Sequence, residues 1–256
     1  MKNKNQKNII NFDNVTIKYP KSKENVLENI SLDLQKGKMI AFIGPSGVGK
    51  TTLFKIIVRA IKPINGNVFL NNENIYNLSK NQWKTKVKKI GFLTQKPNLI
   101  ESDSVYSNIK RSINDYQNWF FKLISFLTFD KRVKIFETLD KLGILNKAFS
   151  RVSDLSGGQK QKVEIAKLLI KDVDLILGDE PTSNLDYKSA NSVMEILKEI
   201  NKKLNITIII NIHDLNLATS YFDQIIMIKD KQIFLNESIN LKNKWNLNEK
   251  VKRQIV

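Results

Sequence analysis

A glycine-rich segment followed by a lysine and two threonines is the strongest chemical signal in the sequence. It consists of Gly44, Pro45, Ser46, Gly47, Val48, Gly49, Lys50 and Thr51, with Thr52 directly after it. Its spacing is that of a phosphate-binding loop, in which glycines let backbone N–H groups surround an anion at a helix N-terminus. Lys50 can reach the β- and γ-phosphates of a nucleotide, and the Thr51 hydroxyl can bind Mg²⁺.

Two adjacent carboxylates, Asp179 and Glu180, end an apolar run that begins at Val173. Alone, such a pair after a strand is more often a solvated turn. Following a phosphate-binding loop, at the end of a parallel strand, it is typical of a hydrolytic site. We therefore expect Asp179 to bind Mg²⁺, directly or through water, and Glu180 to face the attacking water.

Apolar spacing indicates the elements that must position these residues. Period-two or continuous apolar runs predict strands at 9–19, 30–34, 38–43, 90–93, 175–177, 207–210, 224–228 and 233–235. Helices are predicted at 50–61, 81–89, 188–204 and 215–221, the second with a Ser79–Gln82 capping box. Residues 104–170 are helical in pattern, with breaks near 115, 143 and 153–158. This alternation predicts a parallel sheet covered on both faces, with a helical insertion.

The composition excludes several classes of site. The chain has 256 residues, no cysteine and one histidine, so a disulfide framework, a thiol nucleophile and Cys- or His-based metal sites are not expected. The net charge of +17 suits a polyanionic neighbour. The abundance of Asn, Lys and Ile is also typical of AT-rich coding, which weakens the charge as functional evidence.

No apolar segment has the length of a membrane span. The densest, residues 119–129, is interrupted by Lys122 and is far shorter than the roughly 20 residues required. The basic N-terminus lacks a secretory apolar region, because Asn11 and Asp13 break it. We expect a protein that stays in the cytosol and reaches a membrane only through a partner.

The segment Leu155-Ser156-Gly157-Gly158-Gln159 lies between the two chemical motifs. LSGGQ is the signature of the ATP-binding cassette (ABC) transporter family, and nearly the whole chain resembles its ATP-binding subunits. The resemblance implies an α/β P-loop NTPase with a RecA-like, mostly parallel sheet, an antiparallel β subdomain and a helical subdomain with the signature. It also implies one ATP-binding domain over 1–256, divided into a β subdomain and phosphate-loop core at 1–95, a helical subdomain at 96–170 and the remaining core at 171–256.

The same resemblance implies roles for further residues. Tyr19 would stack on adenine, although an ordinary edge-strand aromatic is an equal alternative. Gln95 would contact Mg²⁺ and the γ-phosphate, and His213 would sense that phosphate; an ordinary loop amide and an ordinary surface histidine are the alternatives. Asp186 would belong to a loop beside the nucleotide. Ser156, Gly157, Gly158 and Gln159 would complete the ATP site of a second subunit.

The partners implied are a second copy of the chain, transmembrane permease subunits and a solute-binding lipoprotein, at the cytoplasmic face of the membrane. Residues 95–108, the insertion through Trp119 and residues 211–228 are similar to ATP-binding subunits of phosphonate importers. Other organic-anion cargo or a lipoprotein-release exporter remain alternatives. The aromatic residues of the insertion are expected to leave an exposed docking surface, against the alternative that they are core: Trp119, Phe120, Phe121, Phe126 and Phe129.

Two other classes of function are disfavoured. A nucleic-acid-linked ABC ATPase would suit the charge, but such chains usually carry a long coiled-coil insertion or two cassettes, so direct nucleic-acid binding is not expected. A non-enzymatic binding module would need a defective site. Lys50, Asp179, Glu180 and His213 are all present.

Overall fold

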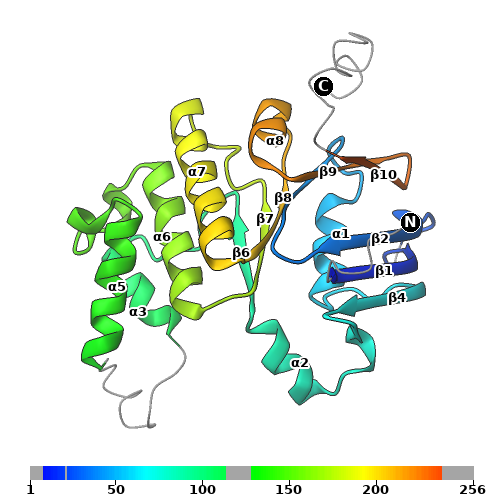
Figure 1. The fold of residues 1–256 in the computed structure, drawn as a ribbon, viewed down its shortest axis with the longest axis horizontal. Coiled ribbons are helices and arrows are strands. Elements are labelled where there is room, and N and C mark those ends of the chain that lie inside the picture. Colours follow the sequence, from blue (N-terminus) through cyan, green and yellow to red (C-terminus); the bar gives the residue numbers. More distant parts are fainter. Residues whose placement is uncertain (1–7, 21, 114–127, 238–256) are drawn as a thin grey trace.

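A six-stranded sheet runs through the centre of the computed structural model (Figure 1), which describes residues 8–20, 22–113 and 128–237. The strand order is β10-β9-β3-β8-β7-β6, parallel except for β10. The strands are β3 (Met39–Ile43), β6 (Ile90–Thr94), β7 (Leu175–Asp179), β8 (Thr207–Asn211), β9 (Gln224–Lys229) and β10 (Gln232–Glu237). All six were predicted from the sequence, and their ends move by only one or two residues.

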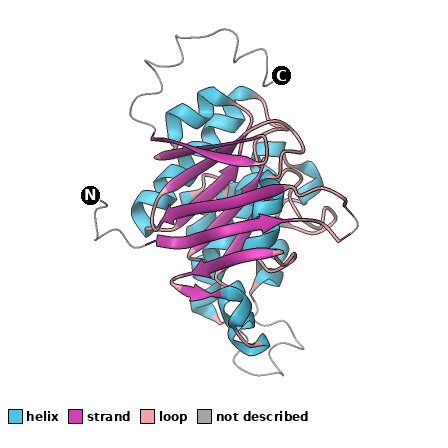
Figure 2. Ribbon diagram, turned by 90° about the vertical axis from the view of Figure 1, so that its right-hand side faces the viewer, coloured by secondary structure: helices cyan, strands magenta, loops and turns pink. Residues whose placement is uncertain are grey.

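A second, antiparallel sheet lies on one side of the first, and Figure 2 views the molecule from that side. Its order is β2-β1-β4-β5, with β1 (Asn8–Ile17), β2 (Leu27–Gln35), β4 (Asn65–Leu70) and β5 (Glu73–Asn74). Apolar spacing predicted β1 and β2. It missed β4, which begins Asn-Gly-Asn and becomes a strand through its pairing with β1.

The central sheet is covered on both faces, as predicted. Successive residues of β8 alternate between two apolar clusters: Ile208 and Ile210 pack on one side, and Ile209 packs on the other. The first side is covered by α6 (Gly157–Lys171), α7 (Tyr187–Leu204) and α8 (Leu215–Tyr221), and α3 (Val105–Ser112) and α5 (Phe129–Lys141) pack on α6. The second side is covered by α1 (Lys50–Ile57) together with the antiparallel sheet.

Helix ends follow local capping. α1 ends at Ile57, before the predicted end at residue 61, because Arg59 adopts a left-handed conformation (φ +58) and Ala60 N–H donates to Lys55 O at 2.8 Å. α2 (Lys80–Val87) begins with the predicted capping box, in which Ser79 and Gln82 bond each other's backbone N–H groups.

The helical insertion was predicted over 104–170, and α3, α5 and α6 occupy it. α5 is followed by Gly143 at φ +66, the predicted break, and short 3₁₀ turns lie at Ile75–Asn77, Leu145–Lys147 and Val152–Asp154. The break near residue 115 and the aromatic residues at 119, 120, 121 and 126 lie outside the described residues. Phe129 is 71% exposed. In the part of the chain that the structure describes, no helix is both long and apolar enough to cross a membrane.

Candidate active site

The predicted phosphate-binding loop connects β3 to α1. Gly44 has φ +151, and a Cβ at this position would lie 2.3 Å from the carbonyl oxygen of Ile228, so the close approach of the two strands requires glycine. Ser46 and Gly47 form the exposed tip of the loop. Gly49 caps α1 at φ +112 without a side-chain bond to the first helical N–H groups. These N–H groups are therefore available to an anion.

Lys50, the first residue of α1, is folded back over the loop. Its Nζ donates to Gly44 O at 2.8 Å and to Pro45 O at 3.0 Å, and the residue is only 5% exposed. Burial lowers the pKa of Lys50, and the nearby Glu180 and Asp179 carboxylates oppose that shift. An ammonium group has three N–H donors, so one remains for a phosphate oxygen.

The Asp179 carboxylate, at the end of β7, contacts the phosphate-binding loop. Thr51 Oγ1 donates to its two oxygens at 3.1 and 3.0 Å. The buried Asn211, opposite Asp179 in the pairing of β7 with β8, donates from Nδ2 to Oδ1 at 2.8 Å. Asn211 was not predicted to belong to the site. Its sequence signal is a polar residue directly after the apolar run 207–210.

Glu180 lies against His213, with Oε1 and Nε2 2.5 Å apart. Its backbone is left-handed, at φ +50, which is unusual for a residue with a side chain. The conformation is held by the Glu180 N–H, which donates to Asn211 O at 3.1 Å, and by the Glu180 carbonyl, which accepts from Ser183 Oγ at 2.9 Å. Strained backbone held in this way is typical of functional sites. Glu180 and His213 also border a cavity of about 380 Å³.

Gln95 follows β6 and is exposed. Its Nε2 donates to Asn184 Oδ1 at 3.2 Å, so within the described residues its hydrogen bond goes to the loop after β7 rather than to Thr51 or Asp179. Asp186, in the same loop, caps α7 by accepting from Ser189 N–H at 2.9 Å. The hydrogen bonds from Ser189 lower the pKa of Asp186.

Tyr19 lies beside α1, close to the phosphate-binding loop. Its hydroxyl is 3.2 Å from Thr52 Oγ1 and accepts from Lys55 Nζ at 3.3 Å. The Lys55 ammonium also lies 5.4 Å from the centre of the Tyr19 ring. Tyr19 therefore contacts the helix that begins with Lys50, although it lies just after the end of β1 in the sequence.

The signature segment forms the N-terminus of α6. Ser156 caps this helix through a capping box with Gln159. Gly157 and Gly158 lie against the loop after β7 and the start of α7: a Cβ on Gly157 would be 2.9 Å from Leu185 Cδ2, and one on Gly158 would be 3.1 Å from Ser189 Cβ. No hydrogen bond joins residues 156–159 to the phosphate-binding loop within the part of the chain that the structure describes.

In the structure, the predicted site residues form separate groups, each joined by its own hydrogen bonds. Thr51 contacts Asp179, and Glu180 contacts His213. Gln95 joins the loop of Asn184, while the signature segment forms its own cap. The first two groups combine phosphate-directed N–H donors, a cation, a hydroxyl and two carboxylates. These are the chemical groups that nucleotide hydrolysis requires.

Comparison with known proteins agrees with this geometry. Residues 27–183 match the family model of ABC transporters. The matched range includes the phosphate-binding loop, the signature segment and both carboxylates.

Relatives match over most of the chain. It is 38% identical over 246 residues to the phosphonates import ATP-binding protein PhnC of Mesoplasma florum, covering 94% of this chain and 98% of that protein. It is 34% identical over 231 residues to "Probable ABC transporter ATP-binding protein p29" of Mesomycoplasma hyorhinis, covering 90% and 92%. Among solved structures, the dimeric ATP-binding cassette MJ0796, in a post-hydrolysis state with ADP and Pi, matches with a TM-score of 0.74 and 30% identity, covering 90% of this chain and 98% of that chain. The chain therefore belongs to the ABC transporter family, with the P-loop NTPase fold, as an ATP-binding subunit that hydrolyses ATP.

Proposed function

We propose that the phosphates of ATP bind between the Gly44–Thr51 loop and Asp179, and that Glu180 activates the attacking water. The contact between the Thr51 hydroxyl and the Asp179 carboxylate carries the proposal, because it joins the phosphate-binding loop to the two-carboxylate motif. Glu180, next in the chain, is then beside the site of attack. Phosphoryl transfer depends on positioning and electrostatics, and the N–H groups and Lys50 would provide both.

The side-chain oxygen atoms beside the phosphate-binding loop are suitable ligands for Mg²⁺. Thr51 and Asp179 would hold the ion together with phosphate oxygens, since Mg²⁺ in such sites is usually bound by one or two carboxylates plus substrate phosphates. The described residues contain no group of three or more His, Cys, Asp or Glu side chains that could hold a metal on their own. The ion would supply positive charge to the phosphate oxygens. Asn211 would keep Asp179 oriented.

Three further side chains complete the proposed site. His213 and Gln95 would sense the γ-phosphate; each now bonds to a side chain of the segment after β7, Glu180 and Asn184, respectively. Both are side-chain contacts that can exchange for a phosphate oxygen. Tyr19 would stack on adenine, which is supported by its contacts with α1.

The signature segment would complete the ATP site of a second copy of the chain, with Asp186 beside it. Two ATP molecules would then lie between the loop of one subunit and residues 156–159 of the other. The dimeric cassette MJ0796, solved with ADP and Pi, supports this assembly.

The transport system would be an importer of phosphonate or a related organic anion. The support is the similarity to PhnC of Mesoplasma florum over nearly the full length of both chains. The ATPase would act at the cytoplasmic face of the membrane on transmembrane permease subunits, and a solute-binding lipoprotein would deliver the cargo.

A groove beside the loop that contains Gln95 supports the proposal that a permease segment docks on this subunit. The groove has a volume of about 620 Å³, and the residues that line it include the apolar Ile90, Phe92 and Leu168 as well as charged side chains. It lies where the proposed subdomains 1–95 and 96–170 meet. A permease segment bound there would be close to the loop that carries Gln95.

The chemical proposal is tested by Glu180→Gln. Loss of the carboxylate should reduce turnover by about 100- to 10,000-fold, as expected for a general base, while leaving ATP binding intact and trapping an ATP-bound dimer. Steady-state turnover and size-exclusion chromatography with ATP and Mg²⁺ measure both. Glu199→Gln, which removes an exposed carboxylate on α7, is the matched control and should retain activity. Near-normal turnover of Glu180→Gln with only monomer in ATP would refute the assignment.

The transport proposal is tested by the proteins that co-purify with the chain from membranes. A permease and a solute-binding lipoprotein that binds phosphonate would support it. The chain could instead co-purify with an exporter, or with a permease whose binding protein does not bind phosphonate. Either result would refute phosphonate as the cargo and leave the ATPase assignment intact.

A further inference from the structure

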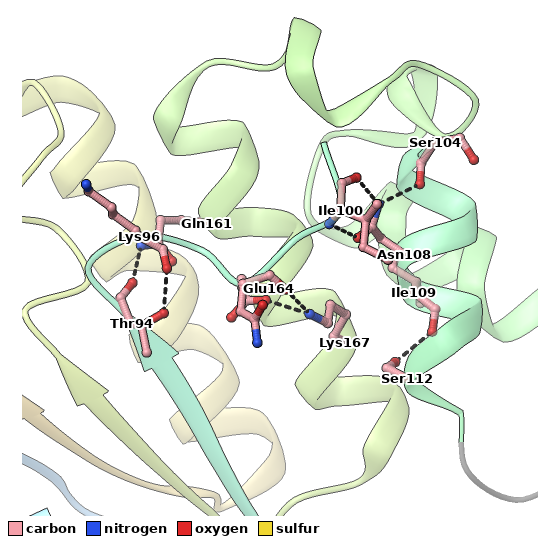
Figure 3. A network of polar contacts seen from close by, with 11 residues as sticks. Thr94, Lys96, Ile100, Ser104, Asn108, Ile109, Ser112, Gln161, Glu164 and Lys167 are labelled. Atoms are coloured by element: carbon pink, nitrogen blue, oxygen red, sulfur yellow. Dashed lines mark hydrogen bonds and ion pairs between the residues drawn. The ribbon is translucent and has the colours of Figure 1, made fainter. Parts of the chain in front are cut away.

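The backbone from Thr94 to Ile100, which contains Gln95, is held by side chains of two helices (Figure 3). From α6, Gln161 Nε2 donates to Thr94 O at 2.9 Å, and Lys167 Nζ donates to Asn98 O at 2.8 Å. From α3, Asn108 accepts from Ile100 N–H at 2.7 Å and donates to Ile100 O at 3.0 Å. The loop is therefore attached at its start, middle and end.

The two amide side chains among these attachments are buried, whereas the bond from Lys167 to Asn98 O is exposed. Gln161 is 1% exposed and Asn108 is 4% exposed. Lys167 is also paired, at 2.6 Å, with Glu164, which is 5% exposed. Hydrogen bonds shielded from water are stronger, and breaking one leaves a buried polar group without a partner. Motion of α6 should therefore carry the loop with it.

Only one end of the Gln161 side-chain amide has a hydrogen-bond partner among the described residues. Its Oε1 is buried and has no hydrogen-bond partner among the described residues. An apolar side chain would avoid this cost, so stability alone does not account for an amide here. What the amide adds is the bond to Thr94 O, at the junction between β6 and Gln95.

We propose that Gln161 is a positioning residue for ATP hydrolysis, supported by Asn108 and Lys167, and that it sets the place of Gln95 through the backbone of Thr94. The inference rests on the proposed role of Gln95 at the γ-phosphate. α6 begins at the signature segment and also holds the Gln95 loop. A displacement of the signature on dimer closure would then move Gln95 in the same chain.

The first test measures the loop itself. Gln161→Met keeps a similar length and volume but removes the donor. Amide hydrogen exchange should accelerate at Leu99 and Ile100, whose N–H groups are hydrogen-bonded in this loop, while β8 exchanges as in the wild type. Asn201→Leu is the control, because Asn201 is 4% exposed and also bonds backbone carbonyls, those of Gly37 and Ile206, away from this loop. Unchanged loop exchange in Gln161→Met, or an equal increase in the control, would overturn the proposal.

The second test measures turnover in the full-length protein by a double-mutant cycle. Gln161→Met should lower kcat by roughly 10-fold, an effect of misplacement, with little change in ADP affinity. In a Gln95→Ala background it should cause no further loss. The same proportional loss in both backgrounds would show that Gln161 does not act through Gln95 and would overturn the inference.

The two readouts separate this inference from the proposed function. If Gln95→Ala turns over ATP at the wild-type rate, the role of Gln95 at the γ-phosphate is wrong, and the link between Gln161 and catalysis falls with it. Faster loop exchange in Gln161→Met would still show that the attachment exists. If Gln95→Ala is impaired but loop exchange in Gln161→Met is normal, only the positioning role fails.

Discussion

Two helix N-termini carry the motifs that we propose contact ATP, and they are capped in opposite ways. α1 begins after Gly49, which offers no side chain to its first N–H groups. α6 begins after Ser156, whose Oγ accepts from Gln159 N–H at 3.3 Å while Gln159 Oε1 accepts from Ser156 N–H at 2.9 Å. The first N-terminus is open to an anion, and the second is occupied by its own side chains.

The difference indicates which motif binds a nucleotide without help. α1 combines free N–H groups with the buried Lys50 ammonium. Lys160, in the first turn of α6, is already paired with Glu101 at 2.9 Å. We therefore expect a single chain to bind ATP through α1 alone. The N-terminus of α6 would contribute only when a second subunit presents a nucleotide to it.

The open N-terminus of α1 is tested by removing the Lys50 ammonium. Lys50→Ala removes a buried charge opposite the phosphates, which typically costs about 3–5 kcal/mol, so ATP affinity should fall by roughly 100-fold or more. Ser156→Arg should leave the affinity of the single chain unchanged. Equilibrium titration with a fluorescent ATP analogue measures both. Equal losses in the two variants would mean that both helix ends bind the same nucleotide within one chain.

The cap of α6 is tested by a substitution with a smaller expected effect. Ser156→Ala removes the cap of α6 and should lower the free energy of unfolding by about 1 kcal/mol. Ser79→Ala removes the same kind of capping box from α2, outside the proposed site, and should cost a similar amount. Urea denaturation checks this equality. Turnover should fall only in Ser156→Ala; a matching fall in Ser79→Ala would reduce the role of Ser156 to helix stability.

The central sheet was predictable because its strands are short apolar runs, and burial on both faces makes apolar content the dominant requirement. β4 was missed because Asn65, Gly66 and Asn67 have low strand propensity and are held by pairing with β1. The end of α1 was missed because a non-glycine residue, Arg59, takes the left-handed conformation.

The site was predictable where spacing within one segment determines chemistry. The phosphate-binding loop and the carboxylate pair are of this kind, and the structure brings Thr51 to Asp179. Asn211 and Gln161 were not predicted as site residues, because each acts on a group distant in sequence: Asn211 on Asp179, and Gln161 on Thr94 O. Only the folded arrangement identifies such partners.

We propose above that each ATP site is shared between the loop of one subunit and the signature segment of another. The most direct measurement is the turnover of a mixture of Ser156→Arg and Lys50→Ala chains, with mixed dimers verified by native mass spectrometry. In a mixed dimer, one site carries both defects and the other carries none. Activity should return in the mixture although each parent is inactive, because one site of the mixed dimer is intact. A mixture in which mixed dimers form but remain as inactive as either parent would contradict it.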